Sequence, residues 1–109
     1  MSYINVPNLY YIGNNSFLNC SSLTFISLPK VSTIYSLAFM NCRSLMSLYI
    51  TTSTVPELSY SNAFTGTPLI DPELTGSFGS IFVKASLVSA FKTDTKWKWS
   101  FYSNRIVGI

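Results

Sequence analysis

The sequence contains no histidine and few charged residues. Charged residues occupy 10% of its 109 positions, against about 25% in typical soluble domains. Serine, threonine and asparagine must therefore supply most of the polar surface. Without histidine the chain lacks the commonest general base and the commonest metal ligand. No apolar run approaches the roughly 18 residues of a membrane span, and the first residues do not resemble a signal peptide. We therefore predict a protein that is not an enzyme, holds no metal or cofactor and does not insert into a membrane.

Acidic and basic residues are unevenly distributed. Asp71 and Glu73 are the only closely spaced carboxylates, and the proline and glycines around them indicate a connecting loop and not a hydrolytic pair. From Lys84 onward five basic residues accompany one acid, so the last quarter of the chain carries the excess behind the net charge of +3. Such a concentration either solvates the end of an uncharged body or marks an acidic partner.

The chain repeats itself at an interval of 22 residues. Residues 6–28 read VPNLYYIGNNSFLNCSSLTFISL, and residues 28–50 read LPKVSTIYSLAFMNCRSLMSLYI. Proline, phenylalanine, asparagine, cysteine and the aliphatic positions coincide in this register, and a looser third copy follows. We treat residues 1–109 as one domain, with repeats at about 4–27, 28–50 and 51–79 and a strand–helix segment at 80–109.

A period of 20–29 residues with leucine-like positions is typical of a leucine-rich-repeat solenoid. Alternating apolar residues predict one parallel strand per copy, at residues 4–6, 26–28, 48–50 and 81–83, the last being the final strand. The predicted fold class is a strand-dominated α/β solenoid, a short right-handed parallel β-solenoid closed by a C-terminal helix.

Stacked copies bring equivalent side chains together in columns. We expect one internal aromatic column and one asparagine ladder that satisfies turn backbone groups. The column comprises Phe17, Phe39 and Phe64, and the ladder Asn19 and Asn41. Cys20 and Cys42 lie one interval apart, which permits a disulfide, but the third copy has no cysteine there. We favour buried, reduced thiols with a structural role.

The repeated unit, I-x-x-x-[AS]-F-x-N-C-x-S-L-x-x-[IL]-x-[IL]-P, resembles the BspA-type leucine-rich repeat. It runs from Ile12 to Pro29 and again from Ile34 to Ile50, and the resemblance covers about residues 4–69. The resemblance implies a segment of a bacterial surface protein, since members are mostly of that kind and some are implicated in adhesion. We accordingly expect an extracellular or cell-surface location, as part of a longer protein.

The last thirty residues are similar to the closing segment of many bacterial members of that family. They depart from it at Lys84, where proline is usual, and in the doubled Trp97 and Trp99. Residues 85–92 favour a helix with Leu87, Val88 and Phe91 on one face. An extended segment would then place Trp97, Trp99 and Phe101 on a common side. Capping of the open repeat end is the interpretation that we favour for this tail.

Two surfaces are candidates for binding. The first is the outward face of the parallel sheet, whose residues lie between the inward strand positions; proteins of this kind commonly bind partners there. It comprises Tyr3, Asn5, Phe25, Ser27, Ser47, Tyr49 and Phe82. The alternative is a basic, aromatic tail that binds a polyanion or nucleic acid. It comprises Lys92, Lys96, Trp97, Lys98, Trp99 and Arg105. A purely structural terminal cap without a ligand is the third possibility.

We expect the sheet face to bind a protein or a surface glycan. The first strand has no visible cap before it, so either the chain is a piece cut from a longer repeat array or its first repeat pairs with another copy. The second alternative makes Tyr3–Val6 a candidate edge for pairing between two copies of the chain. The sequence therefore predicts a non-catalytic recognition or adhesion module with an unidentified partner.

Overall fold

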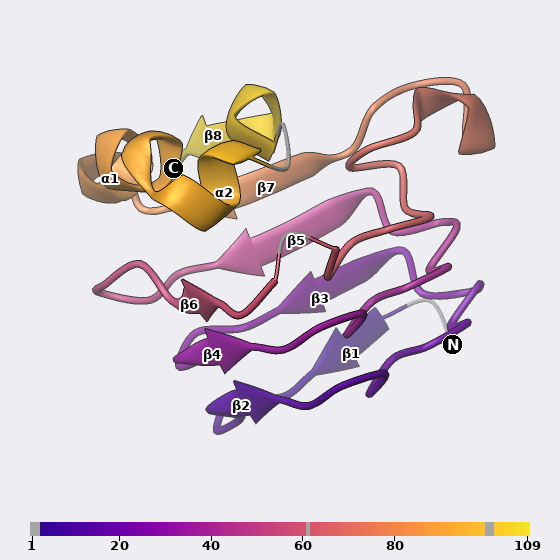
Figure 1. The fold of residues 1–109 in the computed structure, drawn as a ribbon, viewed down its shortest axis with the longest axis horizontal. Helices are drawn as coiled ribbons and strands as arrows, with labels where there is room; N and C mark the ends of the chain where they lie inside the picture. Colours follow the sequence, from indigo (N-terminus) through magenta and orange to yellow (C-terminus); the bar gives the residue numbers. More distant parts are fainter. Residues whose placement is uncertain (1–2, 61, 100–101) are drawn as a thin grey trace.

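The chain passes repeatedly through two parallel sheets (Figure 1). The structure is a computed structural model that describes residues 3–60, 62–99 and 102–109, with backbone alone at 3–5, 98, 99, 102 and 103. In chain order the elements are β1 (Tyr3–Asn5), β2 (Tyr11–Ile12), β3 (Phe25–Ser27), β4 (Thr33–Ile34), β5 (Ser47–Ile50), β6 (Glu57–Leu58), the 3-10 turn Pro72–Leu74, β7 (Ser80–Val83), the 3-10 turn Ala85–Leu87, α1 (Val88–Thr93), α2 (Thr95–Trp99), the 3-10 turn Tyr102–Arg105 and β8 (Ile106–Gly108).

The larger sheet has the order β1-β3-β5-β7-β8, with every pair parallel. Tyr3 pairs with Phe25 and Phe25 with Ser47, so the 22-residue interval of the sequence is the register of the sheet. Ser47 pairs with Ser80 because a longer loop, which contains the Pro72–Leu74 turn, separates β6 from β7. The four predicted strands are confirmed to within one residue.

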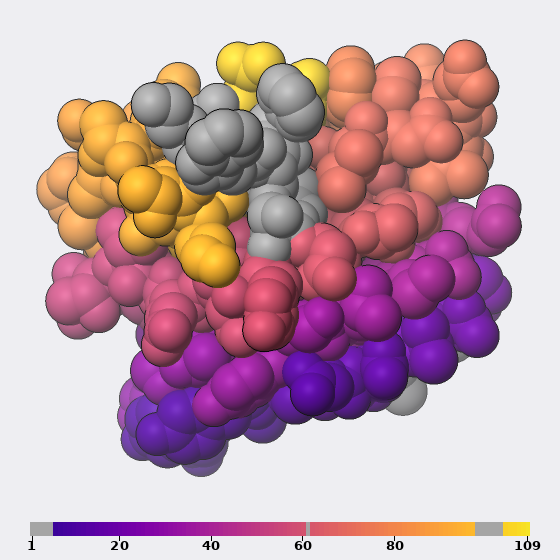
Figure 2. All heavy atoms as spheres, in the orientation of Figure 1, coloured from indigo at the N-terminus to yellow at the C-terminus, as the bar shows by residue number. Residues whose placement is uncertain are grey.

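Strand alternation places the core on one side of this sheet. In β5 and β7 every second side chain is buried, and Leu48, Ile50, Ile81 and Val83 are all 0% exposed. The intervening side chains are partly exposed on the opposite face. Figure 2 shows the copies as successive bands, from the indigo first repeat to the orange tail.

A second, smaller sheet of order β2-β4-β6 lies across the core, and the sequence did not predict it. Each of its strands has two residues, which is too short for an alternating pattern to be recognised. Its inward residues Ile12, Ile34 and Leu58 are at most 1% exposed and close the core opposite the larger sheet.

The third side of each repeat is a column of turns joined by backbone hydrogen bonds. Phe17 N–H donates to Ala38 O at 2.8 Å, and Phe39 N–H donates to Ala63 O at the same distance. These bonds align the turns that contain the three phenylalanines, and the structure confirms the predicted aromatic column. Phe17 and Phe39 stack with ring centroids 5.1 Å apart, and Phe39 and Phe64 stack at 5.3 Å.

The asparagine ladder is confirmed as a contact between the two side chains, although the expected bonds to turn backbone groups are not among the contacts of the described residues, and the ladder has a conformational cause. Asn19 and Asn41 both have φ of 61°, in the left-handed region that few side chains other than asparagine tolerate. Asn41 Nδ2 donates to Asn19 Oδ1 at 3.2 Å. Gly66 holds the next position at φ of 76°, where a Cβ would lie 2.4 Å from Asn41 Oδ1. The ladder therefore ends on a glycine that fits against the amide.

Cys20 and Cys42 are both free thiols, as we favoured. Cys42 is fully buried, whereas Cys20 is only half-buried, which corrects the expectation that both are buried. Cys42 Sγ donates to Phe17 O at 3.0 Å. Burial raises the pKa of the Cys42 thiol from 9.0 to about 11, with smaller contributions from Cys20. Cys42 is therefore a protonated packing residue at neutral pH.

The tail begins with the predicted helix. The turn Ala85–Leu87 leads into α1, whose Phe91 is fully buried, while Leu87 and Val88 pack partly buried against the core. Lys84, where the family pattern has proline, holds φ at −58°. Since proline fixes φ near −65°, the lysine keeps the backbone conformation that proline would impose.

The tail differs from the sequence analysis in two ways, of which the first is a wrong expectation and the second an unmet condition. Residues 81–83 do not form the last strand, because β8 pairs with β7 in parallel beyond it. The segment Thr95–Trp99 is the helix α2, so the common side that an extended segment would give to Trp97 and Trp99 does not arise. Phe101 lies outside the described residues. Asp94 begins α2, its Oδ1 accepting from the N–H groups of Lys96 and Trp97 at 3.0 and 3.3 Å.

Candidate binding surface on the larger sheet

Aromatic side chains form a row across the outward face of the larger sheet. Phe25 lies on β3, Tyr49 on β5 and Phe82 on β7, and all three are partly exposed. The Phe25 and Tyr49 rings lie 4.9 Å apart in a tilted arrangement, as diagonal neighbours. Tyr49 and Phe82 pair directly and stack at 4.5 Å. We call Phe25, Tyr49 and Phe82 the aromatic row.

Small polar side chains flank this row. Ser47 pairs with Phe25 and with Ser80, and Ser27 pairs with Tyr49, all partly exposed. The backbones of Tyr3 and Asn5 continue the two columns onto β1, but their side chains lie outside the described part of the structure. The register therefore brings the predicted sheet-face positions together in two columns of the sheet.

Val107 extends the row, and sequence reasoning missed it. It pairs with Phe82 on β8 and is 41% exposed. Its neighbour Ile106 is buried, so alternation along β8 places Val107 on the outward face of the sheet. The alternation in Arg-Ile-Val-Gly-Ile was the available signal, but it was not interpreted as a strand.

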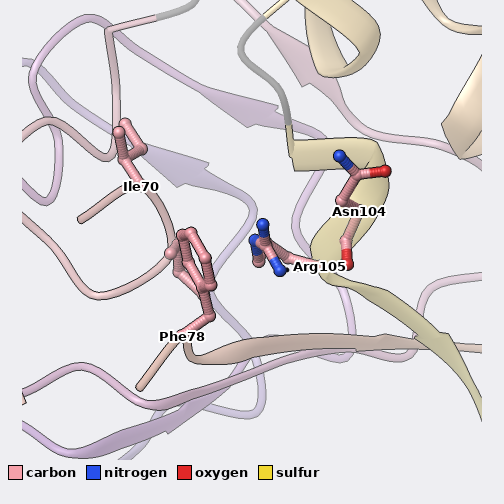
Figure 3. Close-up of a pocket in the computed structure, with 5 residues that line it drawn as sticks. Ile70, Phe78, Asn104 and Arg105 are labelled. Atoms are coloured by element: carbon pink, nitrogen blue, oxygen red, sulfur yellow. Dashed lines mark hydrogen bonds between the residues drawn. The ribbon is translucent and has the colours of Figure 1, made fainter. Parts of the chain in front are cut away.

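A hollow of about 260 Å³ lies near the start of β7 (Figure 3). Its lining residues are Leu69, Ile70, Phe78, Asn104 and Arg105. The Arg105 guanidinium lies 3.3 Å from the centroid of the Phe78 ring, a cation–π contact between the long loop and the end of the tail. Ile70 and Phe78 are each 40% exposed. The hollow therefore combines apolar walls with a positive charge.

The carboxylate of Asp71, in the same loop, has a structural role. Asp71 Oδ1 accepts from Glu73 N–H at 3.0 Å and so begins the turn Pro72–Leu74. This agrees with the prediction of a connecting loop. Within the described residues, no three Cys, Asp or Glu side chains gather as a metal-binding group.

The described side chains of the basic, aromatic tail do not form one surface. Trp97 is 0% exposed, which corrects its assignment to a stacking platform. Its indole lies 6.0 Å from Phe64 and 5.2 Å from Phe91, and its Nε1–H donates to Pro56 O at 3.1 Å. The indole thus covers the last ring of the internal aromatic column.

The tail cations lie at separate places. Lys96 Nζ donates to Ser59 O at 3.1 Å and lies 5.3 Å from the Tyr60 ring, just after β6. Arg105 stacks on Phe78 instead, and Lys92 is exposed on α1. The side chains of Lys98 and Trp99 lie outside the described residues. No helix in the described ranges is long and apolar enough to cross a lipid bilayer.

Comparison with known proteins identifies a repeat family. The family model described as "BspA type Leucine rich repeat region (6 copies)" matches residues 1–86. Searches of curated proteins and of solved structures gave no match. The match includes all three repeats, β7 and the start of the tail. The chain belongs to the BspA-type leucine-rich repeat family.

Proposed function

We propose that the chain is a non-catalytic protein-binding module that uses the aromatic row on the outward face of the larger sheet. The observation that carries the proposal is the row itself: three partly exposed rings in contact across three adjacent strands. Aromatic side chains supply large contact areas at low entropic cost and are enriched at protein interfaces. The family to which the chain belongs favours the same kind of role.

Ring stacking also stabilises a sheet without any ligand, and this is the competing explanation. Binding is favoured because the row continues into Val107, which is 41% exposed, and because Phe78 and Ile70 near the start of β7 are exposed to a similar degree. Cross-strand packing alone does not require these apolar side chains at the surface.

We further infer a short right-handed solenoid, closed at one end by the tail helices. The parallel register, the repeated turn bonds and the burial of Trp97 against Phe64 support this inference. We place the module on a bacterial cell surface or in a secreted protein, as an adhesion segment. Membership of the BspA-type family supports that location.

Substitutions in the row test the proposal. Fluorescently labelled chain is incubated with cultured epithelial cells and with cells of several bacterial species, and bound protein is measured by flow cytometry. We expect saturable binding to at least one cell type. The variants Tyr49→Ala and Phe82→Ala should each weaken it at least tenfold, since central aromatic contacts often contribute about 2 kcal/mol or more.

Tyr35→Ala is the matched control, because Tyr35 is 38% exposed and follows β4 on the other sheet. Circular dichroism must show that all three variants keep the native fold. Protease treatment of the cells should abolish binding, since the proposed partner is a protein. Equal binding by wild type and both row variants would contradict the proposal, and so would binding that resists protease but is lost with glycosidase.

A further inference from the structure

The hollow near the start of β7 lies between two segments that are far apart in the sequence. Ile70 and Phe78 belong to the long loop between β6 and β7, and Arg105 ends the 3-10 turn before β8. Figure 3 shows Ile70 and Phe78 on one side of the Arg105 guanidinium and Asn104 on the other. The hollow therefore places two apolar side chains, each 40% exposed, next to one positive charge.

Backbone hydrogen bonds hold the apolar side of the hollow in place. Gly79 N–H donates to Pro68 O at 3.0 Å and so joins the two ends of the segment that contains Ile70 and Phe78. Ile70 N–H donates to the carbonyl oxygen of Thr67 at 3.1 Å, and Thr67 is itself 0% exposed. The two apolar side chains are thus positioned before any ligand arrives, which lowers the entropic cost of binding.

The half-buried Arg105 guanidinium is positioned by Phe78 but keeps most of its donors available. Its Cζ lies 3.3 Å from the centroid of the Phe78 ring, so the ring covers one face of the planar group. A guanidinium carries five N–H donors around the edge of its plane. In the described part of the chain, Nη1 donates to Asn104 O at a long 3.4 Å, and no carboxylate pairs with the group.

A carboxylate is the ligand group that fits this edge. Its two oxygens accept two parallel N–H bonds from one guanidinium, and such charged bidentate pairs are among the strong hydrogen bonds. Inorganic phosphate or sulfate can accept the same bonds, but neither has an apolar part to place against Ile70 and Phe78. An acid with an aromatic or branched aliphatic body matches both the charge and the apolar side of the hollow.

The volume of the hollow sets the size of such an acid. At about 260 Å³ it is smaller than the roughly 300–1,000 Å³ of pockets for drug-sized molecules, but larger than an engineered cavity of about 150 Å³ that binds benzene. We propose that the hollow binds a small monocarboxylic acid with an aromatic or branched aliphatic body. The carboxylate pairs with Arg105, and the body packs against Ile70 and Phe78. None of these residues belongs to the aromatic row, so the proposal does not depend on the proposed function.

The stack of Arg105 on Phe78 also joins the long loop to the tail, and a purely structural contact is the competing explanation. A structural contact requires the stacked ring and cation. It gives no preference for a carboxylate over a neutral molecule of the same shape. Ligands that differ in one feature therefore distinguish the two explanations.

Titration of the full chain with phenylacetate, followed by two-dimensional ¹H–¹⁵N NMR, tests the site. We expect saturable shifts at the amides of Ile70, Phe78 and Arg105, with a dissociation constant on the order of 1 mM, and no shifts in β3. Phenylacetamide, which lacks the charge, should bind at least tenfold more weakly. Acetate, which lacks the apolar body, should do the same.

Two variants locate the carboxylate. Arg105→Gln removes the fork and should weaken phenylacetate binding at least tenfold. Lys92→Gln is the matched control, because it removes the same charge from an exposed position on α1 and should leave binding unchanged. The NMR spectrum of each variant shows whether it is folded, and the comparison of ligands on the wild-type chain does not depend on either variant.

Several outcomes would overturn the proposal. They are the absence of saturable binding up to about 20 mM phenylacetate, equal binding of phenylacetamide or acetate, and shifts confined to residues outside the hollow. A folded Arg105→Gln variant that binds phenylacetate as well as wild type would overturn it too.

Discussion

At the scale of single residues, the repeats depend on positions where the backbone is left-handed. Asn19, Asn41 and Gly66 occupy the same turn position with φ of 61°, 61° and 76°. Leu37 also has a positive φ, at 57°, and its N–H donates to Asn62 Oδ1 at 3.4 Å. Asparagine and glycine therefore occupy turn positions because they tolerate a positive φ. At Leu37 a hydrogen bond to a side-chain acceptor accompanies the positive φ instead.

Substitution of Asn41 separates conformation from hydrogen bonding. Asn41→Gly removes the amide bond to Asn19 but keeps access to positive φ, whereas Asn41→Ala removes the bond and adds steric strain. We expect the alanine variant to be less stable than the glycine variant by about 1 kcal/mol. Urea unfolding of both variants measures this difference, and equal midpoints would show that φ at this position is not restrictive.

The raised pKa of Cys42 predicts slow thiol chemistry. At pH 8 a thiol with pKa of about 11 holds about 100-fold less thiolate than one at its ordinary value of 9.0. Ellman's reagent should therefore modify Cys42 of the folded chain at least 100-fold more slowly than Cys42 of the urea-unfolded chain. A Cys20→Ala variant makes the signal specific to Cys42. Comparable rates in the folded and unfolded states would contradict the buried position.

The same shift makes stability depend on alkaline pH. The folded pKa is raised, so its stabilising contribution is complete below pH 9.0 and is lost as the pH rises toward about 11. A Cys42→Ala variant should lose less stability than wild type over this range in urea titrations. An identical loss in both proteins would assign the effect to other groups.

At the scale of elements, the tail acts mainly through Trp97. Its indole contacts Phe64 and Phe91 and donates to Pro56 O, all within a fully buried site. Trp97→Ala should lower the free energy of unfolding by about 3–5 kcal/mol, because it leaves a large cavity. Chemical denaturation measures the change. Tyr35→Ala, at an exposed position, should stay within about 0.5 kcal/mol of wild type.

The elements that could be predicted from the sequence are those that repeat. Strands β1, β3, β5 and β7 share one alternating pattern, and the first three recur at the fixed interval of 22 residues, so each copy supports the others. The smaller sheet was not predicted because a strand of two residues is too short to show an alternating pattern. The segment Thr95–Trp99 escaped it because alternating tryptophans fit a strand, whereas Asp94 and the burial of Trp97 impose a helix.

The candidate surface could be predicted only in part, for the same physical reason. Phe25, Tyr49 and Phe82 follow from strand alternation and register. Val107 and the contact between Arg105 and Phe78 do not, because they depend on how the tail returns to the sheet. A single copy of a segment gives no internal comparison, and its long-range contacts are set by packing.

At the scale of the whole molecule, the stack of repeats places the packed core and the exposed aromatic side chains on opposite sides of the larger sheet. Inward columns hold the aromatic and aliphatic core, and the outward face of the larger sheet holds the aromatic row. The charged residues contribute little to that row; Lys96 contacts the region after β6, and Lys92 is exposed on α1. The account therefore assigns binding to apolar contacts and not to the positive charge of the tail.

The salt dependence of cell binding tests this assignment most directly. The affinity of the labelled chain is measured from 50 to 500 mM sodium chloride. An interface built on the aromatic row predicts a change of less than about threefold, since apolar contacts are not screened. Binding of a polyanion by four tail cations would instead weaken on the order of several hundredfold for a single strand and several thousandfold for a duplex over this tenfold range. Such a loss would contradict the account.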